Sequence, residues 1–300
     1  MIRAAGHKVN YQSSKQNKWK KALKKPCDII AVAGGDGTVG KVARRLAGNR
    51  IPIAILPVGT ANNLAHALGL TGISLKNLVT GWKTARRVNF DVGVAEGPWG
   101  SSYFIEGFGV GLFAATIARI REVNRFDLAN SARREDEIKS VLRILKEQLH
   151  KHRAKKLNVR LDDQDLSGDF LLLEALNIRY VGPNLDLVPG ADTNDGLLDV
   201  VLVSCADEAK LRKYLTNCIT RRSAKANLPV HRGRRLQIEW DRFPVHIDDK
   251  AWPKNKDRNP RRSNAIDISI GAHALVFLTP RRMRRQLKRQ SVVARSRAPD

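Results

Sequence analysis

Two glycine-bearing stretches of the sequence carry residue types that bind phosphate groups. The first is Gly34-Gly35-Asp36-Gly37-Thr38, and the second is Gly59-Thr60-Ala61-Asn62-Asn63. Glycine lets the backbone come close to a ligand because no Cβ atom is in the way. Free N–H groups at the start of a following helix then favour an anion, with phosphate as the obvious candidate. A tight structural turn is the alternative interpretation of either loop alone.

Asp36 is the only carboxylate in the first loop, where it is flanked by glycines at the start of a helix. This place suits a phosphate-bound metal or a magnesium-bound water. Neither loop matches GxxxxGK[ST] or GxGxxG, so the sequence disfavours P-loop and Rossmann chemistry.

The flanking residues predict two strand–loop–helix units in succession. Ile29 to Ala33 and Ile53 to Leu56 are apolar throughout, as buried parallel strands are. Helices follow each loop, the first marked by apolar residues up to Leu46 and the second covering Ala61 to Leu68. A basic helix over Lys15 to Lys25 precedes the first strand. Because the carboxyl ends of neighbouring parallel strands meet at one edge, both loops are expected to line one crevice.

After about Arg86 the pattern changes to alternating apolar and polar residues, which predicts a mostly antiparallel second domain. The expected strands cover residues 88–94, 158–161, 169–178, 198–203, 236–240 and 266–270. Two helices interrupt them, one capped by Ser131 and carrying Ile138, Val141, Leu142, Leu145 and Leu149 on one face, the other carrying Leu211, Leu215 and Ile219. Asp162, Asp163 and Asp165 are expected at a hairpin tip without a catalytic role.

Charge and composition limit the possible partners. The 300 residues hold 54 Lys and Arg against 29 Asp and Glu, a formal charge of +25, which favours a polyanionic partner. Three separate cysteines predict no disulfide framework, and no apolar run has the length of a signal or a membrane span. A cytoplasmic protein is therefore expected. Nucleic-acid binding is disfavoured because helix-turn-helix, zinc-finger and RNP-like patterns are absent.

Three motifs together resemble one enzyme family. They are Gly34-Gly35-Asp36-Gly37-Thr38, the run from Leu56 to Ala65 (LPVGTANNLA), and a later block with Asn177, residues 188–191 (VPGA) and residues 195–199 (DGLLD). The chain resembles the catalytic domain of the diacylglycerol kinase and sphingosine kinase family, especially its bacterial soluble lipid kinases. GGDGT is shared with NAD kinases and phosphofructokinases, whereas the PxGTxN continuation is typical of the lipid kinases.

The resemblance implies an α/β domain similar to that of phosphofructokinases and NAD kinases, over residues 1–86 and rejoined by 275–300. A β-sandwich-like lipid-binding domain covers residues 87–274. ATP is the implied co-substrate, with Mg²⁺, and its γ-phosphoryl group is transferred to a lipid hydroxyl. The implied ATP-binding residues are Gly34, Gly35, Asp36, Gly37, Thr38, Gly59, Thr60, Ala61, Asn62, Asn63, Leu64 and Ala65. The implied metal-binding residues are of two kinds: Asp91 belongs to a metal and water network, and Asp195 and Leu197, with the carbonyl of Asp192, belong to a structural magnesium site.

Three departures from the family pattern bear on activity. Asn63 stands where the family often has Asp, and no NPxSG-like loop is found before Gly6. The family's late Asp-Gly-Glu aligns with Asp248-Asp249-Lys250, and a protonated lysine cannot accept a proton from a hydroxyl. Asp36 and either Asp248 or Asp249 are the expected catalytic carboxylates, and a simple β-turn pair is the alternative for the last two.

The expected function is an ATP-dependent kinase for a diacylglycerol-like lipid, working peripherally at an anionic membrane surface. Arg258 to Arg262 and Arg281 to Arg285 are the candidate membrane-binding segments. The alternative is a weakly active or inactive homologue that binds lipid or nucleotide.

Overall fold

The chain forms two compact units, each with its own core. The structure is a computed structural model that describes residues 1–123, 134–222, 224–253 and 264–281. Unit 1 contains Met1–Phe90 and Ala274–Asp300, and unit 2 contains Asp91–His273. The chain crosses between the units twice, within strands β3 (Arg86–Gly97) and β17 (Ala265–Thr279).

Unit 1 is built on parallel strands, as the sequence predicts. Besides its parts of β3 and β17, its elements are η1 (Arg3–Ala5), α1 (Trp19–Ala22), β1 (Ile30–Gly34), α2 (Asp36–Leu46), β2 (Ile53–Pro57), α3 (Asn63–Ala67), α4 (Leu75–Thr80) and η2 (Trp82–Thr84). Strand β1 runs parallel to β2 over five residue pairs, from Ile30 opposite Ile53 to Gly34 opposite Pro57. The end of β17 pairs with β2 in parallel, with Phe277 opposite Ile53.

Two helices in unit 1 are shorter than expected. The basic helix predicted over Lys15 to Lys25 reduces to the four residues of α1. Six lysines in that segment repel one another, and the helix start lacks a side-chain cap. Helix α3 begins at Asn63 because Asn62 takes the left-handed conformation, with φ of 54°.

Unit 2 is mostly antiparallel, which confirms the expected fold class. Besides its parts of β3 and β17, its elements are β4 (Gly100–Phe104), β5 (Gly107–Gly111), α5 (Leu112–Val123), α6 (Arg134–Lys151), β6 (Lys155–Leu157), β7 (Val159–Leu161), β8 (Gln164–Asp165), β9 (Gly168–Leu176), β10 (Tyr180–Val181), β11 (Leu185–Asp186), β12 (Leu198–Ser204), η4 (Cys205–Asp207), α7 (Glu208–Ile219), β13 (Val230–Gly233), β14 (Arg235–Glu239), β15 (Val245–Ile247) and β16 (Lys250–Trp252). The predicted hairpin tip lies between β7 and β8. Ser131, the expected helix cap, lies outside the described residues.

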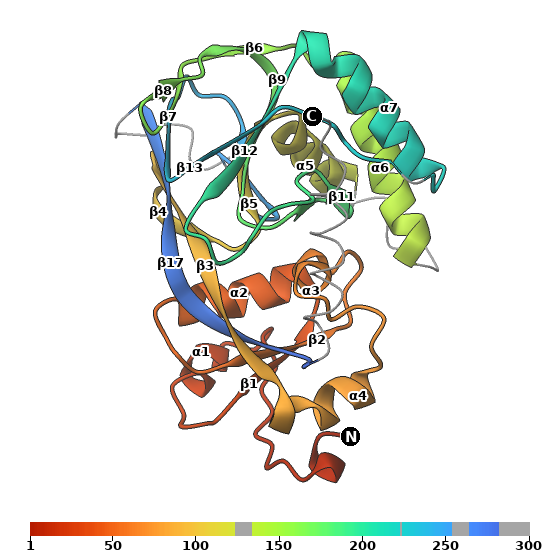
Figure 1. Ribbon diagram of the computed structural model, residues 1–300, viewed down its shortest axis with the longest axis vertical. Coiled ribbons are helices and arrows are strands. Elements are labelled where there is room, and N and C mark those ends of the chain that lie inside the picture. Colours follow the sequence, from red (N-terminus) through yellow and green to blue (C-terminus); the bar gives the residue numbers. More distant parts are fainter. Residues whose placement is uncertain (124–133, 223, 254–263, 282–300) are drawn as a thin grey trace, which may run out of the picture. The chain divides into compact units, whose positions relative to one another are not determined.

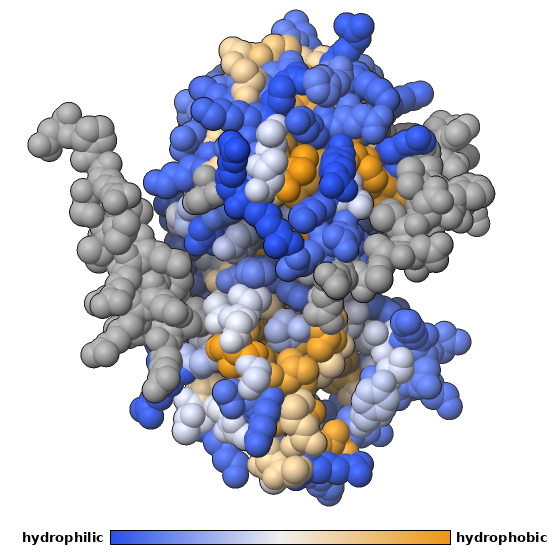
Figure 2. Space-filling model, turned by 90° about the vertical axis from the view of Figure 1, so that its right-hand side faces the viewer, coloured by the Kyte–Doolittle hydropathy of each residue, from blue (hydrophilic) through white to orange (hydrophobic). Residues whose placement is uncertain are grey.

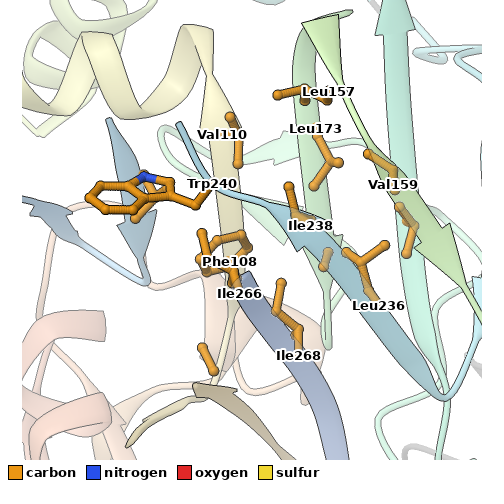
Figure 3. Packing of buried hydrophobic residues seen from close by; sticks show 14 of the residues in the cluster. Phe108, Val110, Leu157, Val159, Leu173, Leu236, Ile238, Trp240, Ile266 and Ile268 are labelled. Atoms are coloured by element: carbon orange, nitrogen blue, oxygen red, sulfur yellow. The ribbon is translucent and has the colours of Figure 1, made fainter. Parts of the chain in front are cut away.

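The strands of unit 2 form two layers with a hydrophobic core between them. One layer has the order β17-β14-β7-β8, and the other has the order β13-β12-β9-β5-β15-β16. Figure 3 shows Phe108 and Leu173 from the second layer facing Leu236 and Ile238 from the first. This core is completed by Trp240, Trp252 and the start of β17.

Helices cover the other face of the second layer (Figure 1). Alternate residues of β9 and β12 point to this side and pack against α5, α6 and α7. The predicted apolar faces of α6 and α7 supply Leu142, Leu145 and Leu149, and Leu211 and Leu215. Strands β9 and β12 are therefore buried on both faces over most of their length.

Hydrophilic residues cover most of the described surface in Figure 2, as the excess of Lys and Arg requires, and apolar residues are exposed in smaller groups. Within the described residues, no helix combines the length and the apolar character needed to cross a bilayer.

Candidate active site

The two glycine loops of unit 1 leave the same ends of adjacent parallel strands. Gly34 ends β1, and its cross-strand partner Pro57 ends β2. The N–H of Val58 donates to the carbonyl of Gly34, with an N to O distance of 3.3 Å, which continues the strand pairing into the loops. The expected juxtaposition of Gly34–Thr38 with Gly59–Ala65 is therefore present.

Gly35 and Gly59 bring the two loops into direct backbone contact. A Cβ atom built on Gly59 would lie 2.1 Å from the Cα of Gly35, and one on Gly35 would lie 2.8 Å from the Cα of Gly59. The second loop also closes on itself through Asn62, whose Oδ1 accepts the N–H of Gly59 at 3.0 Å and whose Nδ2 donates to its carbonyl at 2.8 Å. Both positions need glycine for space.

Asp36 links the two loops through its carboxylate. Its Oδ1 accepts the N–H of Leu64, in the first turn of α3, at 3.0 Å. Burial raises the pKa of Asp36, and the backbone N–H groups of Leu64 and its neighbours oppose that shift. Because these N–H groups face Asp36, the start of α3 is capped by the protein itself. The uncapped helix start in this region is that of α2, where Gly35 offers no side-chain cap.

Asp91 is the centre of a hydrogen-bond network in unit 2. Its Oδ1 accepts the N–H of His273 at 2.6 Å, and its Oδ2 accepts the N–H of Gly196 at 2.8 Å. Its own N–H donates to the carbonyl of Thr193 at 2.8 Å. Asp91 is 1% exposed. It therefore fixes the loop before β12 and the start and end of the unit 2 chain.

Asn177 extends this network to the start of β5. Its Nδ2 donates to the carbonyls of Asp91, at 2.9 Å, and Ile105, at 3.0 Å. The N–H groups of Ile105, Glu106 and Gly107 in turn donate to the carboxylate of Asp248, at 2.8 to 3.3 Å. Positions 91, 177, 196 and 248, far apart in the sequence, are thus joined by backbone and side-chain hydrogen bonds.

Asp248 and Asp249 are the two central residues of the β15–β16 turn, a position compatible with either interpretation of the pair. Ile247 pairs with Lys250 across the hairpin, and Asp248 has a φ of 50°. The carboxylate of Asp248 is buried against the three N–H groups, whereas Asp249 and Lys250 are exposed. The two carboxylates therefore differ in accessibility, which favours Asp249 as the reactive one.

Arg232 lies between two carboxylates near the implied metal site. Its guanidinium pairs with Asp195 and, at 3.0 Å, with Asp199, which lies opposite it on β12. Burial raises the pKa of Asp199 to about 6, with Arg232 opposing and Asp195 adding to the shift. A cavity of about 430 Å³ opens beside Asp199 and Arg232, with Leu187, Val188 and Leu228 among its lining residues.

The side chains at the implied structural magnesium site already make other contacts. One oxygen of Asp195 accepts the N–H of Leu197 and the other pairs with Arg232, while Asp192 accepts the N–H of Asn194. Both oxygens of Asp91 accept backbone N–H groups. The described residues contain no cluster of three metal-binding side chains. The guanidinium of Arg232 supplies a positive charge beside Asp195.

Three residues near this network were missed in the sequence: Glu174, His246 and Arg232. Glu174 and His246 form a fully buried pair, at 2.9 Å. The signal for Glu174 is a single charge inside the apolar run of β9, because a buried charge requires a partner. Of the expected membrane-binding segments, 258–262 and 282–285 lie outside the described residues.

Comparison with known proteins agrees with both units. Residues 2–95 match the diacylglycerol kinase catalytic domain, and residues 121–261 match the YegS C-terminal NAD kinase beta sandwich-like domain. A diacylglycerol kinase from Mycobacterium tuberculosis is 30% identical over 271 residues, covering 87% of this chain and 79% of the relative.

Two solved structures share the fold. A diacylglycerol kinase from Bacillus anthracis gives a TM-score of 0.61 at 18% identity, covering 89% of this chain and 84% of its own. An NAD kinase from Archaeoglobus fulgidus in complex with ATP gives 0.53 at 12% identity, covering 96% and 90%. The two-domain architecture is therefore common to lipid and nucleotide kinases.

Proposed function

Because the chain belongs to the family of the diacylglycerol kinase catalytic domain, we propose that it transfers the γ-phosphoryl group of ATP to the hydroxyl of a diacylglycerol-like lipid. The observation that carries this proposal is the backbone contact between Gly35 and Gly59 at the ends of β1 and β2. It brings the backbones of the two loops together at the start of α2, an arrangement that suits a polyphosphate. The Archaeoglobus fulgidus relative of the same fold was solved with ATP, which supports this choice of co-substrate.

In the proposed reaction the protein positions the reactants and accepts one proton. The N–H groups at the start of α2 bind phosphate oxygens, and the glycines let the backbone approach them. Asp249 accepts the proton of the lipid hydroxyl while the hydroxyl oxygen bonds to the γ-phosphorus, and the bond from that phosphorus to the β,γ-bridging oxygen breaks and releases ADP. The carboxylate of Asp248 holds the turn in place.

Magnesium enters the proposal as part of the co-substrate. One carboxylate, phosphate oxygens and water are a sufficient ligand set for Mg²⁺. Asp36 is the carboxylate within the two loops, and after accepting the N–H of Leu64 it retains lone pairs for such a contact. The ion would neutralise charge on the transferred phosphoryl group.

The test is transfer of radiolabel from ATP to diacylglycerol, phosphatidylglycerol and sphingoid bases in mixed micelles. We expect transfer to at least one lipid, and a loss of about 10²-fold or more for Asp249→Asn, the size of effect typical of a general base. Asp241→Asn, which changes another exposed carboxylate of unit 2, is the matched control. Absence of transfer to every lipid would contradict the proposal.

A nucleotide- or lipid-binding homologue without turnover is the second candidate. It is favoured by one observation: Lys250, exposed at the start of β16, stands where the resemblance places a catalytic Glu. Stabilisation of the chain by ATP, without transfer in the micelle assay and without gain in Lys250→Glu, would support this candidate over the kinase.

Action at an anionic membrane surface completes the proposal. Six exposed lysines lie between Lys15 and Lys25, and each basic side chain near such a surface contributes about 1 kcal/mol. Sedimentation with anionic vesicles tests this, comparing the full chain with one lacking 281–300 and with one carrying Gln at the six positions. Unchanged sedimentation in both variants would remove these segments from the proposal.

A further inference from the structure

Glu174 and His246 form a buried pair that neither the sequence motifs nor the proposed reaction uses. Glu174 is 0% exposed and His246 is 1% exposed. They lie on β9 and β15, on either side of β5, where both are paired in register with Gly109. The pair therefore spans the central strand at Gly109, one of the three glycines of β5.

Gly109 is required for this contact. A Cβ atom at this position would lie 2.0 Å from Oε1 of Glu174 and 2.3 Å from Nε2 of His246. No real Cβ atom approaches other atoms so closely, so any other residue would push the two side chains apart. Residues of three strands, Glu174 on β9, Gly109 on β5 and His246 on β15, are thus all needed for this one ionisable pair.

The hydrogen bonds of His246 fix how many protons the pair holds. Nδ1 lies 2.9 Å from the carbonyl oxygen of Asp248, and Nε2 lies 2.9 and 3.0 Å from the two carboxylate oxygens of Glu174. A carbonyl only accepts, so Nδ1 carries a proton. Nε2 then either donates from an imidazolium to a carboxylate or accepts from a carboxylic acid. Both forms contain one bridging proton and have no net charge.

Loss of that proton breaks one of the two contacts. A neutral imidazole has a single N–H, which can point either to the Asp248 carbonyl or to the Glu174 carboxylate. If it points to the carbonyl, the lone pair of Nε2 faces an ionised carboxylate. If it points to the carboxylate, the lone pair of Nδ1 faces the carbonyl oxygen. A lone pair is repelled more strongly by an ionised carboxylate than by a neutral carbonyl oxygen, so the second arrangement is favoured and the turn at Asp248 loses its hydrogen bond to His246.

We propose that Glu174 and His246 are positioning residues, whose shared proton holds the Asp248–Asp249 turn in the shape that presents Asp249 to the lipid hydroxyl. The inference rests on the proposed function for the role of Asp249, and on the geometry alone for the hold on the turn. Asp248 is fixed at both ends, through its carbonyl by His246 and through its carboxylate by the N–H groups of residues 105–107. Deprotonation of the pair releases the first of these contacts.

The surroundings keep the proton on the pair. The cross-strand neighbours on the outer sides are Val201, opposite Glu174, and Ala251, opposite His246, and neither ionises. Burial raises the pKa of Glu174, against the field of His246. Burial lowers the pKa of His246, but the charges of Glu174 and Asp248 and their hydrogen bonds outweigh it, so the net pKa lies above the ordinary value. Both directions extend the protonated range towards higher pH.

The activity test compares the pH dependence of kcat in the wild type and in Glu174→Gln. In the wild type we expect kcat to fall about tenfold per pH unit on the alkaline side, as one essential proton is lost. The amide of a glutamine can donate to neutral Nε2 while Nδ1 still donates to Asp248, so both contacts persist without the bridging proton. We expect the maximal kcat of Glu174→Gln to lie within about threefold of the wild-type value, because one hydrogen bond changes only modestly. We expect its kcat not to fall on the alkaline side.

Glu147→Gln is the matched control, because Glu147 forms an exposed pair with Lys151 on α6. It should reproduce the wild-type profile. An unchanged alkaline fall in Glu174→Gln would overturn the proposal.

A second measurement needs no substrate, and so separates failure of this inference from failure of the proposed function. Backbone amide exchange at residues 105–107 and 248–250 is followed with rising pH, corrected for the intrinsic pH dependence of exchange. We expect wild-type protection to fall as the pair deprotonates and Glu174→Gln to stay protected. In ¹⁵N-histidine spectra, Nδ1 of His246 should carry a proton at neutral pH. An unprotonated Nδ1, or pH-independent protection in the wild type, overturns the inference even if Glu174→Gln fails to fold.

Discussion

The candidate functional residues of unit 1 and those of unit 2 are held in opposite ways. In unit 1 the contacts join neighbouring loops. The two loops can touch because Gly35 and Gly59 have no side chains. In unit 2 the contacts join residues 72 to 182 positions apart in the sequence. The carboxylates of Asp91 and Asp248 accept hydrogen bonds from backbone N–H groups. Unit 1 offers backbone to a ligand, whereas unit 2 uses its buried carboxylates to hold itself together. Substitutions of these residues in unit 2 are therefore expected to act through the change in charge. Substitutions of the loop glycines in unit 1 are expected to act through the added volume.

The largest expected effect is that of Gly59→Ala. The added methyl group would lie 2.1 Å from the Cα of Gly35, so the two loops must separate. Displacements near 1 Å cost about 10²-fold in rate, and we expect at least that loss of phosphoryl transfer, together with loss of stabilisation by ATP. Gly190→Ala is the control, because a Cβ there meets nothing within 4 Å. Full activity in Gly59→Ala would show that loop contact is dispensable.

This division also explains what the sequence could predict. The glycine loops and their strands are visible because a strand, a loop and a helix follow one another within about thirty residues, which is the range over which periodicity and turn signals act. The role of Asp248 is not visible, because its three donors lie more than 140 positions away. Glu174 and His246 depend on Gly109 in a third strand, and nothing in the sequence sets the register that unites them. The fold and the juxtaposition of the two glycine loops are therefore within reach of sequence analysis, and the contacts of individual carboxylates in unit 2 are not.

Asp248→Ala should separate stability from chemistry in the turn. It leaves the N–H groups of Ile105, Glu106 and Gly107 without their acceptor, and we expect the free energy of unfolding to fall by about 2–4 kcal/mol. Asp248→Asn should cost less, since it keeps one oxygen acceptor and tolerates the left-handed conformation. Urea unfolding measures both.

The adjacent Asp249→Ala gives the reverse pattern. Asp249 is exposed, so its removal should leave the free energy of unfolding nearly unchanged while transfer activity is lost. Equal destabilisation by Asp248→Ala and Asp249→Ala would remove the distinction between the two carboxylates.

Asp199→Asn is expected to stabilise the chain in a pH-dependent way. The pKa of Asp199 is raised to about 6 in the folded state, so the folded chain holds a proton that the unfolded chain releases as pH rises from about 4 to 6. Across that window the wild type loses stability, and above it the ionised carboxylate is a constant cost. We expect Asp199→Asn to gain about 1–3 kcal/mol at pH 7 to 8 relative to wild type, and to lose this gain near pH 4.

The measurement is urea unfolding at several pH values, with Asp169→Asn, an exposed carboxylate of the same unit, as control. A gain of the same size at every pH would mean that ionisation of Asp199 is not its source.

The smallest expected effect is that of magnesium on the thermal stability of unit 2. It tests whether the guanidinium of Arg232 takes the place of a metal ion. Arg232 pairs with Asp195 and Asp199, so the positive charge that Mg²⁺ would supply near Asp195 is already present. Two cations this close to the same carboxylates would repel each other, and an arginine fixed by two partners is not displaced without losing both pairs. In the absence of nucleotide, Mg²⁺ and EDTA should therefore give the wild type the same Tm within about 1 °C, a shift that corresponds to a few tenths of a kcal/mol or less. Arg232→Gln removes the guanidinium and leaves the two carboxylates facing each other, and in this variant Mg²⁺ should raise the Tm. Stabilisation of the wild type by Mg²⁺ that disappears in Asp195→Asn would reverse the conclusion, because it would place an ion beside Asp195 together with Arg232.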